Sequence, residues 1–430
     1  MFPQAPTVAK SAMSLKRNTL WNLAGSAIPL LAAVVCIPFT LGRLGSEAFG
    51  VLTLLWGLIG YFSLFDLGVG RALTYRLSLL AASGQHGETA ATIKAGVLLT
   101  LATGIFGALL VGCLSPRLVN GWLKIGPTLQ PDALLAFFLA AAGVIPTTLA
   151  SGLRGGLEGM GRFAASNVSR MALGLLMFIL PVWAVLVHGP DLWVITLYLV
   201  GARLLVVVCM FVQLRAHLFA GTWRPQRQYL NSLWSYGLWV SVTGVLGPLM
   251  VYGDRFFVSA TVGAQHLSLY AIPQEGLFRL LLIPAALASA LLPRLAAMGS
   301  TEAAAVYRHT YRKVALYMLG VCVFAAAVAY PGLSVWLSPE FAQSALPIVL
   351  VMCLGIWINS MAVVPYTLMH AKGNPRLTAI FHFGELCFYL VALWLLSARY
   401  GLVGAAWAWV ARVVLDWVLL QLAVRRLYGV

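Results

Sequence analysis

Long apolar stretches separated by short polar connections fill almost the whole chain. A run of about 20 apolar residues spans the hydrocarbon core of a bilayer as a helix, because only a helix satisfies its own backbone hydrogen-bonding groups in lipid. We read twelve such spans, at 20–41, 48–68, 92–112, 132–152, 168–188, 192–212, 236–260, 270–292, 314–336, 343–366, 377–397 and 402–424. The pattern predicts an all-α, polytopic membrane protein with twelve transmembrane helices and no soluble domain.

Basic residues fall mainly in alternate connections between the spans. Most of the 28 Lys and Arg residues lie on one side, whereas the opposite side has Arg43, Arg117, Lys124, Arg255 and Arg399. Cytoplasmic loops carry such an excess, so both termini are predicted to be cytoplasmic. The same rule accounts for the formal net charge of +16, which in a soluble protein would favour nucleic acid, and no nucleic-acid partner is expected.

The two halves of the chain show a faint likeness when one is shifted by 218 residues along the other. Gly45 then coincides with Gly263, and Phe49 coincides with Leu267. A shift of six spans preserves orientation, so the repeat would relate two parallel bundles by an axis along the membrane normal. A chance likeness is the alternative. The predicted six-helix bundles, which would enclose a central cavity, are residues 1–215 and 216–430.

Common motifs for nucleotide hydrolysis, metal binding and covalent catalysis are missing from the sequence. There is no G-x-x-x-x-G-K-[S/T] phosphate loop, no H-E-x-x-H and no G-x-S-x-G. The six cysteines occur singly, without a C-x-x-C pair. We therefore expect no metal, no disulfide, no cofactor and no enzymatic activity, which leaves transport as the main hypothesis.

Two motifs near the second span carry a resemblance to a known family. The first is an LG-x-x-x-F-G turn at Leu44–Gly50, and the second is a D-L-G-x-x-x-A-x-x-x-R segment at Asp66–Arg76. Similar pieces of the second half are Asp254-Arg255, Val262-Gly263, Tyr270-Ala271 and Leu292-Pro293-Arg294. With these motifs the chain resembles the polysaccharide transporter family, whose best-known members are the O-antigen (Wzx-type) flippases of the multidrug/oligosaccharidyl-lipid/polysaccharide superfamily.

The resemblance implies a fold, a substrate and a location. It implies a V-shaped pair of bundles around a cationic lumen in the bacterial inner membrane. Through that lumen an undecaprenyl-diphosphate-linked oligosaccharide would pass from the cytoplasmic to the periplasmic leaflet by alternating access. Membrane lipid, a polysaccharide polymerase and a chain-length protein would be the partners.

Arginines inside or beside the predicted spans are the candidates for binding the diphosphate or the sugar. A guanidinium group stays protonated and pairs with two phosphate oxygens at once, so it lowers the barrier to moving an anionic headgroup. Structural alternatives are open for each. Arg203 could pair with an acid of another helix, and Arg255 could reach the interface. Arg279 and Arg412 each have an acid four residues away, with which they could pair. The candidates are Arg203, Arg279, Arg255 and Arg412.

Acidic and imidazole groups within the spans are the candidates for ion or proton coupling. In the span 377–397, Thr378, His382, Glu385 and Tyr389 recur at helical spacing and share one face. A carboxyl or imidazole group among apolar helices can take up and release a proton during a transport cycle. Hydrogen bonding between helices is the alternative. The candidates are Glu385, His382, Glu275 and Asp416.

Polar residues of the first two spans are candidates for a gate or for the lumen lining. Asn22 and Ser26 share a face at the start of the first span, and Asp66 and Arg71 lie where the second span meets the cytoplasm. Contacts between helices and interfacial anchoring are the respective alternatives.

Three other functions compete with the flippase hypothesis. A multidrug or metabolite antiporter of the same superfamily is the nearest, although a cavity for organic cations should present unpaired acids. A membrane glycan polymerase or ligase usually needs a large external loop, which the spans leave no room for. Lipid II flippases generally have 14 helices, against the twelve that we read here.

Overall fold

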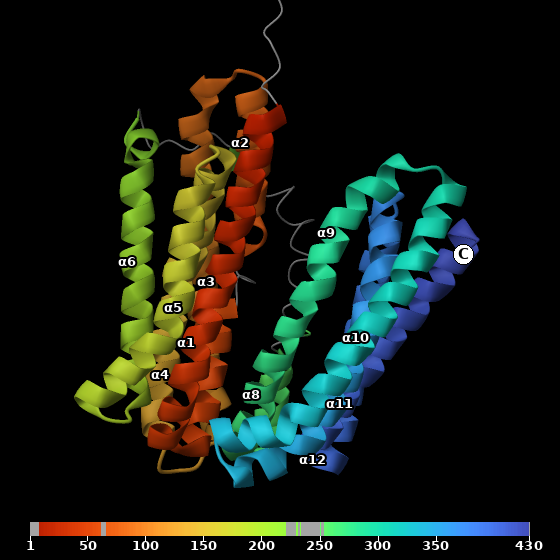
Figure 1. The fold of residues 1–430 in the computed structure, drawn as a ribbon. Helices are drawn as coiled ribbons and strands as arrows, with labels where there is room; N and C mark the ends of the chain where they lie inside the picture. Colours follow the sequence, from red (N-terminus) through yellow and green to blue (C-terminus); the bar gives the residue numbers. More distant parts are fainter. Residues whose placement is uncertain are drawn as a thin grey trace, which may run out of the picture. The chain divides into compact units, whose positions relative to one another are not determined.

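The computed structural model is built from α-helices, with no strand among the residues that it describes (Figure 1). These are residues 8–61, 66–220, 229–230, 233, 250 and 253–429, and only the backbone is described for residues 8–28. The chain forms two compact units. One comprises residues 1–45, 55–117 and 127–244, and the other comprises 46–54, 118–126 and 245–430. A simple division at residue 215 stays a prediction.

The helices of the first half are long and mostly apolar. They are α1 Val8–Trp56 with the π-helix Gly57–Tyr61, α2 Val69–Ala82, α3 Thr89–Arg117 with the π-helix Leu118–Trp122, α4 Gln130–Gly159, α5 Phe163–His188 and α6 Leu192–Leu218. Buried Leu73, Ile93, Leu153 and Leu214 from α2, α3, α4 and α6 belong to one apolar core. This core fixes the positions of these four helices within their unit.

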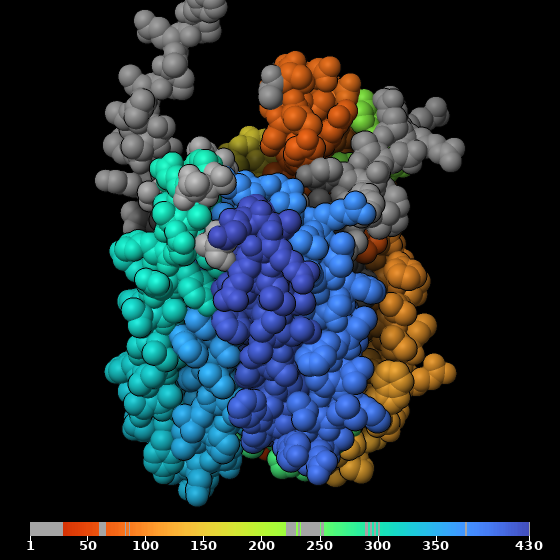
Figure 2. Space-filling model, turned by 90° about the vertical axis from the view of Figure 1, so that its right-hand side faces the viewer, coloured from red at the N-terminus to blue at the C-terminus, as the bar shows by residue number. Residues whose placement is uncertain are grey.

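The helices of the second half follow the same pattern. They are α8 Leu267–Phe278, a 3₁₀ turn Arg279–Leu281, α9 Leu282–Ala297, α10 Ser300–Trp336, α11 Pro339–Ala371 and α12 Pro375–Tyr428. On the face shown in Figure 2, α10 lies beside the last part of α12. Two side-chain hydrogen bonds join them, because the Tyr307 hydroxyl contacts Gln421 at 3.0 Å and the Trp417 indole donates to Tyr311 at 2.9 Å.

The described residues contain nine helical stretches that are long and apolar enough to cross a membrane. Two of them hold a break, at Gly45 (φ 78°) in α1 and at Gly401 (φ 60°) in α12, so each covers two predicted spans. The predicted span 236–260 lies mostly outside the described residues. Many large apolar side chains are exposed, as expected for helices that face lipid. The predicted all-α, polytopic fold is confirmed.

Short segments 46–54 and 118–126 belong to the second unit because they bond to its helices. The Ser259 hydroxyl donates to the Leu123 carbonyl at 2.7 Å, and the Lys124 ammonium donates to the Thr261 carbonyl at 2.6 Å. A Cβ atom at Gly50 would collide with the carbonyl oxygen of Ala264, so glycine is required for this close approach.

The two turns that the sequence shift superimposes have similar backbones. Gly45 has φ 78° and Gly263 has φ 111°, both in the region that favours glycine. Phe49 and Leu267, each four residues further on, are fully buried. An internal repeat predicts this equivalence, and the faint likeness of the halves gains structural support at these positions.

Candidate functional site

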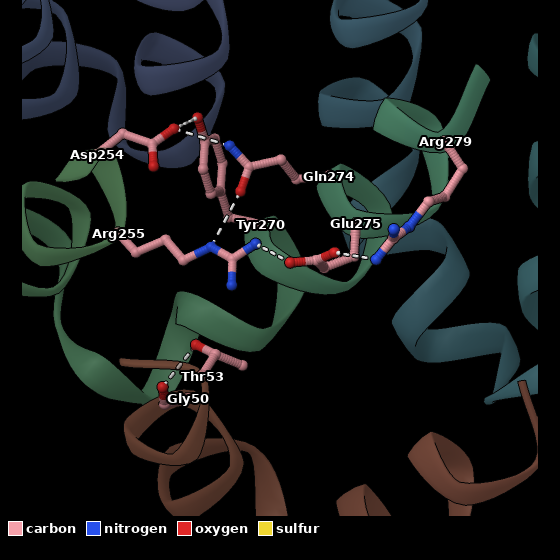
Figure 3. A network of polar contacts seen from close by, with 8 residues as sticks. All are labelled: Gly50, Thr53, Asp254, Arg255, Tyr270, Gln274, Glu275 and Arg279. Atoms are coloured by element: carbon pink, nitrogen blue, oxygen red, sulfur yellow. Dashed lines mark hydrogen bonds and ion pairs between the residues drawn. The ribbon is translucent and has the colours of Figure 1, made fainter. Parts of the chain in front are cut away.

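A polar network lies in the second unit, and Figure 3 shows its members between Asp254 and Arg279. Asp254 is the hydrogen-bond acceptor shared by several residues of this network. Its Oδ2 atom accepts hydrogen bonds from the Tyr270 hydroxyl at 2.7 Å, from the Gln274 amide at 2.8 Å and from the Tyr389 hydroxyl of α12 at 3.3 Å. Charge buried in a helix bundle is costly unless hydrogen-bonded, and three donors offset that cost at Asp254. The network consists of Asp254, Arg255, Tyr270, Gln274, Glu275, Arg279 and Tyr389.

Arg255 is buried in the network. Its side chain is only 1% exposed, and it donates to Gln274 at 3.1 Å and to Glu275 at 2.8 Å. We expected Arg255 either to contact cargo or to reach the membrane interface. The interfacial alternative is wrong, because the guanidinium is buried and pairs with the neighbouring amide and carboxylate inside the protein.

Glu275 is shared by two arginines. One oxygen pairs with Arg255, and the other pairs with Arg279 at 3.3 Å. The predicted Glu275–Arg279 pair is therefore confirmed, but Glu275 also pairs with the buried guanidinium of Arg255. Arg279 retains 37% exposure of its side chain and forms the accessible end of the network. Two acids and two arginines leave the network balanced in formal charge.

A second polar cluster surrounds Glu385 of α12. Glu385 is fully buried, and one of its oxygens lies 3.6 Å from Nε of Arg412 and 3.8 Å from Nδ1 of His382. These contacts are longer than normal hydrogen bonds, so the carboxyl group is held loosely. Asp416 is buried one turn beyond Arg412 and interacts electrostatically with Glu385. Among the described residues, Arg412 forms an ion pair with Glu385, and it also interacts electrostatically with Asp416, so two acids share this arginine.

The predicted polar face of the span 377–397 is buried against neighbouring helices. Thr378 hydrogen-bonds to His370 of α11 at 3.0 Å, and Tyr389 reaches Asp254. Hydrogen bonding between helices is therefore one confirmed use of this face. Since Glu385 lies one turn before Tyr389, α12 also brings the two polar clusters close together.

Arg203 has a different environment in the first unit. It is buried, and it donates to the carbonyls of Ile59 at 3.1 Å and Leu199 at 2.9 Å. The Ile59 carbonyl lies in a π-helical turn and also accepts from Thr147 at 3.1 Å. The alternative of pairing with an acid is wrong within the described part of the chain. The carbonyl contacts give Arg203 a role in stabilising this π-helical turn.

Asp66 shapes the turn before α2. Its carboxylate accepts from the Gly68 amide at 2.7 Å and from the Ser151 hydroxyl of α4. Leu67 (φ 45°) and Gly68 (φ 68°) both have left-handed backbones, which explains the need for a local acceptor. Of the other gate candidates, Arg71 is exposed, and the side chains of Asn22 and Ser26 lie outside the described residues.

Gln274 and the role of Tyr270 were missed from the sequence. An amide in an apolar span next to Glu275 is a signal, because polar groups in transmembrane helices need partners. Gln274 contacts Asp254, which lies 20 residues earlier, and spacing in the sequence alone could not show this contact.

Solved structures define the class of fold. An inward-facing multidrug resistance MATE family transporter of the MOP superfamily matches with a TM-score of 0.73 and 12% identity, over 93% of this chain and 96% of that chain. The inward closed conformation of the lipid II flippase MurJ matches with a TM-score of 0.69 and 14% identity, over 95% of this chain and 87% of that chain. The fold is therefore that of MOP superfamily transporters.

Sequence comparison then gives the family. A family model described as "Polysaccharide biosynthesis protein" matches residues 41–346. A protein of Shigella flexneri described as "Putative O-antigen transporter" is 30% identical over 423 residues, which cover 97% of this chain and 99% of that protein. The chain belongs to the polysaccharide biosynthesis protein family, and the resemblance seen in its motifs is confirmed.

Proposed function

We propose that this protein is a flippase for undecaprenyl-diphosphate-linked oligosaccharide repeat units. It would move them from the cytoplasmic to the periplasmic leaflet of the bacterial inner membrane, with both termini in the cytoplasm. The observation that carries the proposal is the full-length similarity to the Shigella flexneri protein described as an O-antigen transporter. The polytopic fold and the MOP superfamily neighbours support a transport function rather than an enzymatic one.

Moving a diphosphate through a bilayer requires positive groups that are not fully neutralised. Arg279 is the most suitable contact in the second unit, because its guanidinium is partly exposed and shares its acid with Arg255. Alternating access by two bundles would carry the headgroup past this arginine. Arg255 and Arg412 are buried in the same unit and would act mainly by holding the helices that present it, whereas the buried Arg203 would stabilise the first unit.

Coupling to an ion or proton gradient would use the cluster around Glu385. Its carboxyl is buried beside Arg412, His382 and the second carboxyl of Asp416, so the pair of acids could bind a proton or a small cation in one conformation and release it in another. Asp416 and His382 would share in this exchange, and Glu275 would couple through Arg279 in the neighbouring network.

An antiporter of drugs or metabolites is the second candidate, because MATE transporters have the same fold. The two functions make different predictions for a bacterium that builds a surface glycan. Deletion of a flippase gene should abolish the glycan and leave lipid-linked repeat units accessible only from the cytoplasm. Deletion of an antiporter gene should leave the glycan intact and change drug sensitivity.

The decisive experiment combines deletion with complementation by the full chain. Restored glycan with the wild-type chain, and reduced glycan with Arg279→Ala at equal protein abundance, would support the proposal. The Arg279→Lys variant should be intermediate, because lysine keeps the charge but loses two-point contact with phosphate. An intact glycan after deletion would refute the flippase proposal.

A further inference from the structure

An apolar groove of about 660 Å³ runs between α5 and α6 of the first unit. These helices are neighbours joined at one end by the short connection after His188, as Figure 1 shows. The lining of the groove includes Leu176, Leu180, Leu197, Gly201 and Leu205. A Cβ atom at Gly201 would have nothing within 4 Å, so this glycine opens the floor of the groove.

The length of the groove matches one leaflet of a bilayer. Twelve residues separate Leu176 from His188 along α5, and at 1.5 Å per residue this is about 18 Å. The hydrocarbon core is about 30 Å thick, so the groove reaches roughly from the interface to the midplane. Exposed Leu186 and Leu205 nearby are typical of a lipid-facing surface. These dimensions suit one extended hydrocarbon chain.

One end of the groove is polar and carries an acid. Asp191 precedes α6, but its carboxylate makes no capping hydrogen bond. Asp132 of α4 takes that role by accepting from the amides of Leu192 at 2.8 Å and Trp193 at 3.0 Å. Within the described residues Asp191 also has no ion pair, so its exposed carboxylate is available to a ligand.

Two further polar groups lie at this end. His188 and Tyr198 form a hydrogen bond of 3.1 Å. If the imidazole donates, the tyrosine hydroxyl keeps a proton to offer to a phosphate oxygen. Trp193 is exposed beside them, as is usual for tryptophan at a membrane interface. The groove therefore has an apolar body and a headgroup end with both a negative charge and donors.

We propose that this groove binds one acyl chain of an aminophospholipid of the phosphatidylethanolamine class, with its ammonium group beside Asp191 and its phosphate beside the His188–Tyr198 pair. Asp191 is the charged group among the described residues that line the groove, and none of them is Lys or Arg, so an anionic diphosphate headgroup would be repelled there. The ligand is therefore a bilayer lipid and not the lipid-linked cargo. Because the N-terminus is proposed to be cytoplasmic and five spans precede the connection after His188, this connection is periplasmic. The headgroup therefore lies in the periplasmic leaflet.

Native mass spectrometry of the full chain tests this site. The protein is purified from mixed vesicles of phosphatidylethanolamine and phosphatidylglycerol with identical acyl chains, and the retained lipids are counted. The wild type should retain phosphatidylethanolamine in preference. Gly201→Leu should lose one bound lipid because the new side chain fills the groove. The matched control is Gly320→Leu on α10, where a Cβ atom also meets nothing within 4 Å.

Asp191→Asn separates the headgroup contact from the groove itself. An exposed ion pair contributes up to about 1 kcal/mol, so the preference for phosphatidylethanolamine should fall about two- to fivefold while one lipid stays bound. Equal retention of both lipids by the wild type, or equal loss in Gly201→Leu and Gly320→Leu, would overturn the proposal. Displacement of the bound lipid by added undecaprenyl phosphate at equal concentration would also overturn it, in favour of the carrier lipid.

Discussion

The hydroxyl of Tyr389 lies 3.3 Å from Oδ2 of Asp254, although 135 positions separate the two residues in the sequence. This contact joins α12 to the segment that carries Arg255. Because Glu385 lies one turn before Tyr389, a change at one polar cluster can be transmitted to the other through a single helix. The candidate cargo contact at Arg279 and the candidate coupling group at Glu385 are thereby connected.

Arg255 and Arg279 should respond differently to the same substitution. Arg255→Ala leaves the buried Asp254 and the half-buried Glu275 with less compensation, and loss of one partner of a buried pair costs about 3–5 kcal/mol. Arg279→Ala breaks a partly exposed pair and should cost at most about 1 kcal/mol. Thermal unfolding of the purified variants, read together with glycan export, would show this difference. Equal losses of stability would contradict the buried role of Arg255.

Glu385→Gln should abolish the dependence of export on an ion or proton gradient and leave the protein folded. Glutamine has nearly the same shape but cannot bind and release a proton, and it would be tolerated because Asp416 still balances the charge of Arg412. Export is measured in inverted vesicles with and without an imposed gradient. Glu340→Gln, at the exposed start of α11, is the matched control. Unchanged gradient dependence in Glu385→Gln would remove this residue from the coupling mechanism.

Gly50→Ala should destabilise the protein, because the new methyl group collides with the Ala264 carbonyl. Overpacking of this kind costs about 1–3 kcal/mol. Gly42→Ala is the control, since a Cβ atom there meets nothing within 4 Å and alanine favours the helix. The midpoint of thermal unfolding should fall in the first variant and stay level or rise in the second. The same midpoint in both would show that the turn adapts to the methyl group.

Asp66→Ala should weaken the turn before α2 by about 1–3 kcal/mol, because the Gly68 amide and the Ser151 hydroxyl lose their acceptor. Arg71→Ala, at an exposed position of α2, should have little effect on stability. Limited proteolysis near residue 66 provides the measurement. If Asp66 were instead a gating group with no structural role, export would fall while proteolysis stayed the same.

The sequence predicted where the helices lie in the chain better than which residues their side chains contact. Hydropathy locates a span because lipid imposes a length and a composition, and most described helices cover the predicted spans. The exception is α2 (Val69–Ala82), which lies between two predicted spans and was not predicted. Rotation about the helix axis depends on packing against distant segments. Arg203 was expected to need an acid or water, yet it bonds to carbonyls of a π-helical turn that no local pattern predicted.

The contacts of the charged motifs also depend on distant segments, so the sequence could not predict them. Asp254 and Arg255 occur together in the sequence, which indicates a helix end, but their burial is set by Tyr270, Gln274 and Tyr389 from other parts of the chain. Asp66 was read as a gate because it lies where a span ends. Its hydrogen bonds to Gly68 and Ser151 show a turn-forming role that requires knowing where α4 lies.

The close approach of Gly50 to Ala264 has an evolutionary consequence. If the two halves arose by duplication, their equivalent turns later became neighbours, so a larger residue at position 50 requires the backbone at Ala264 to move. Descendants of the common ancestor should therefore keep glycine at position 50 unless a backbone shift or deletion near position 264 accompanies its replacement.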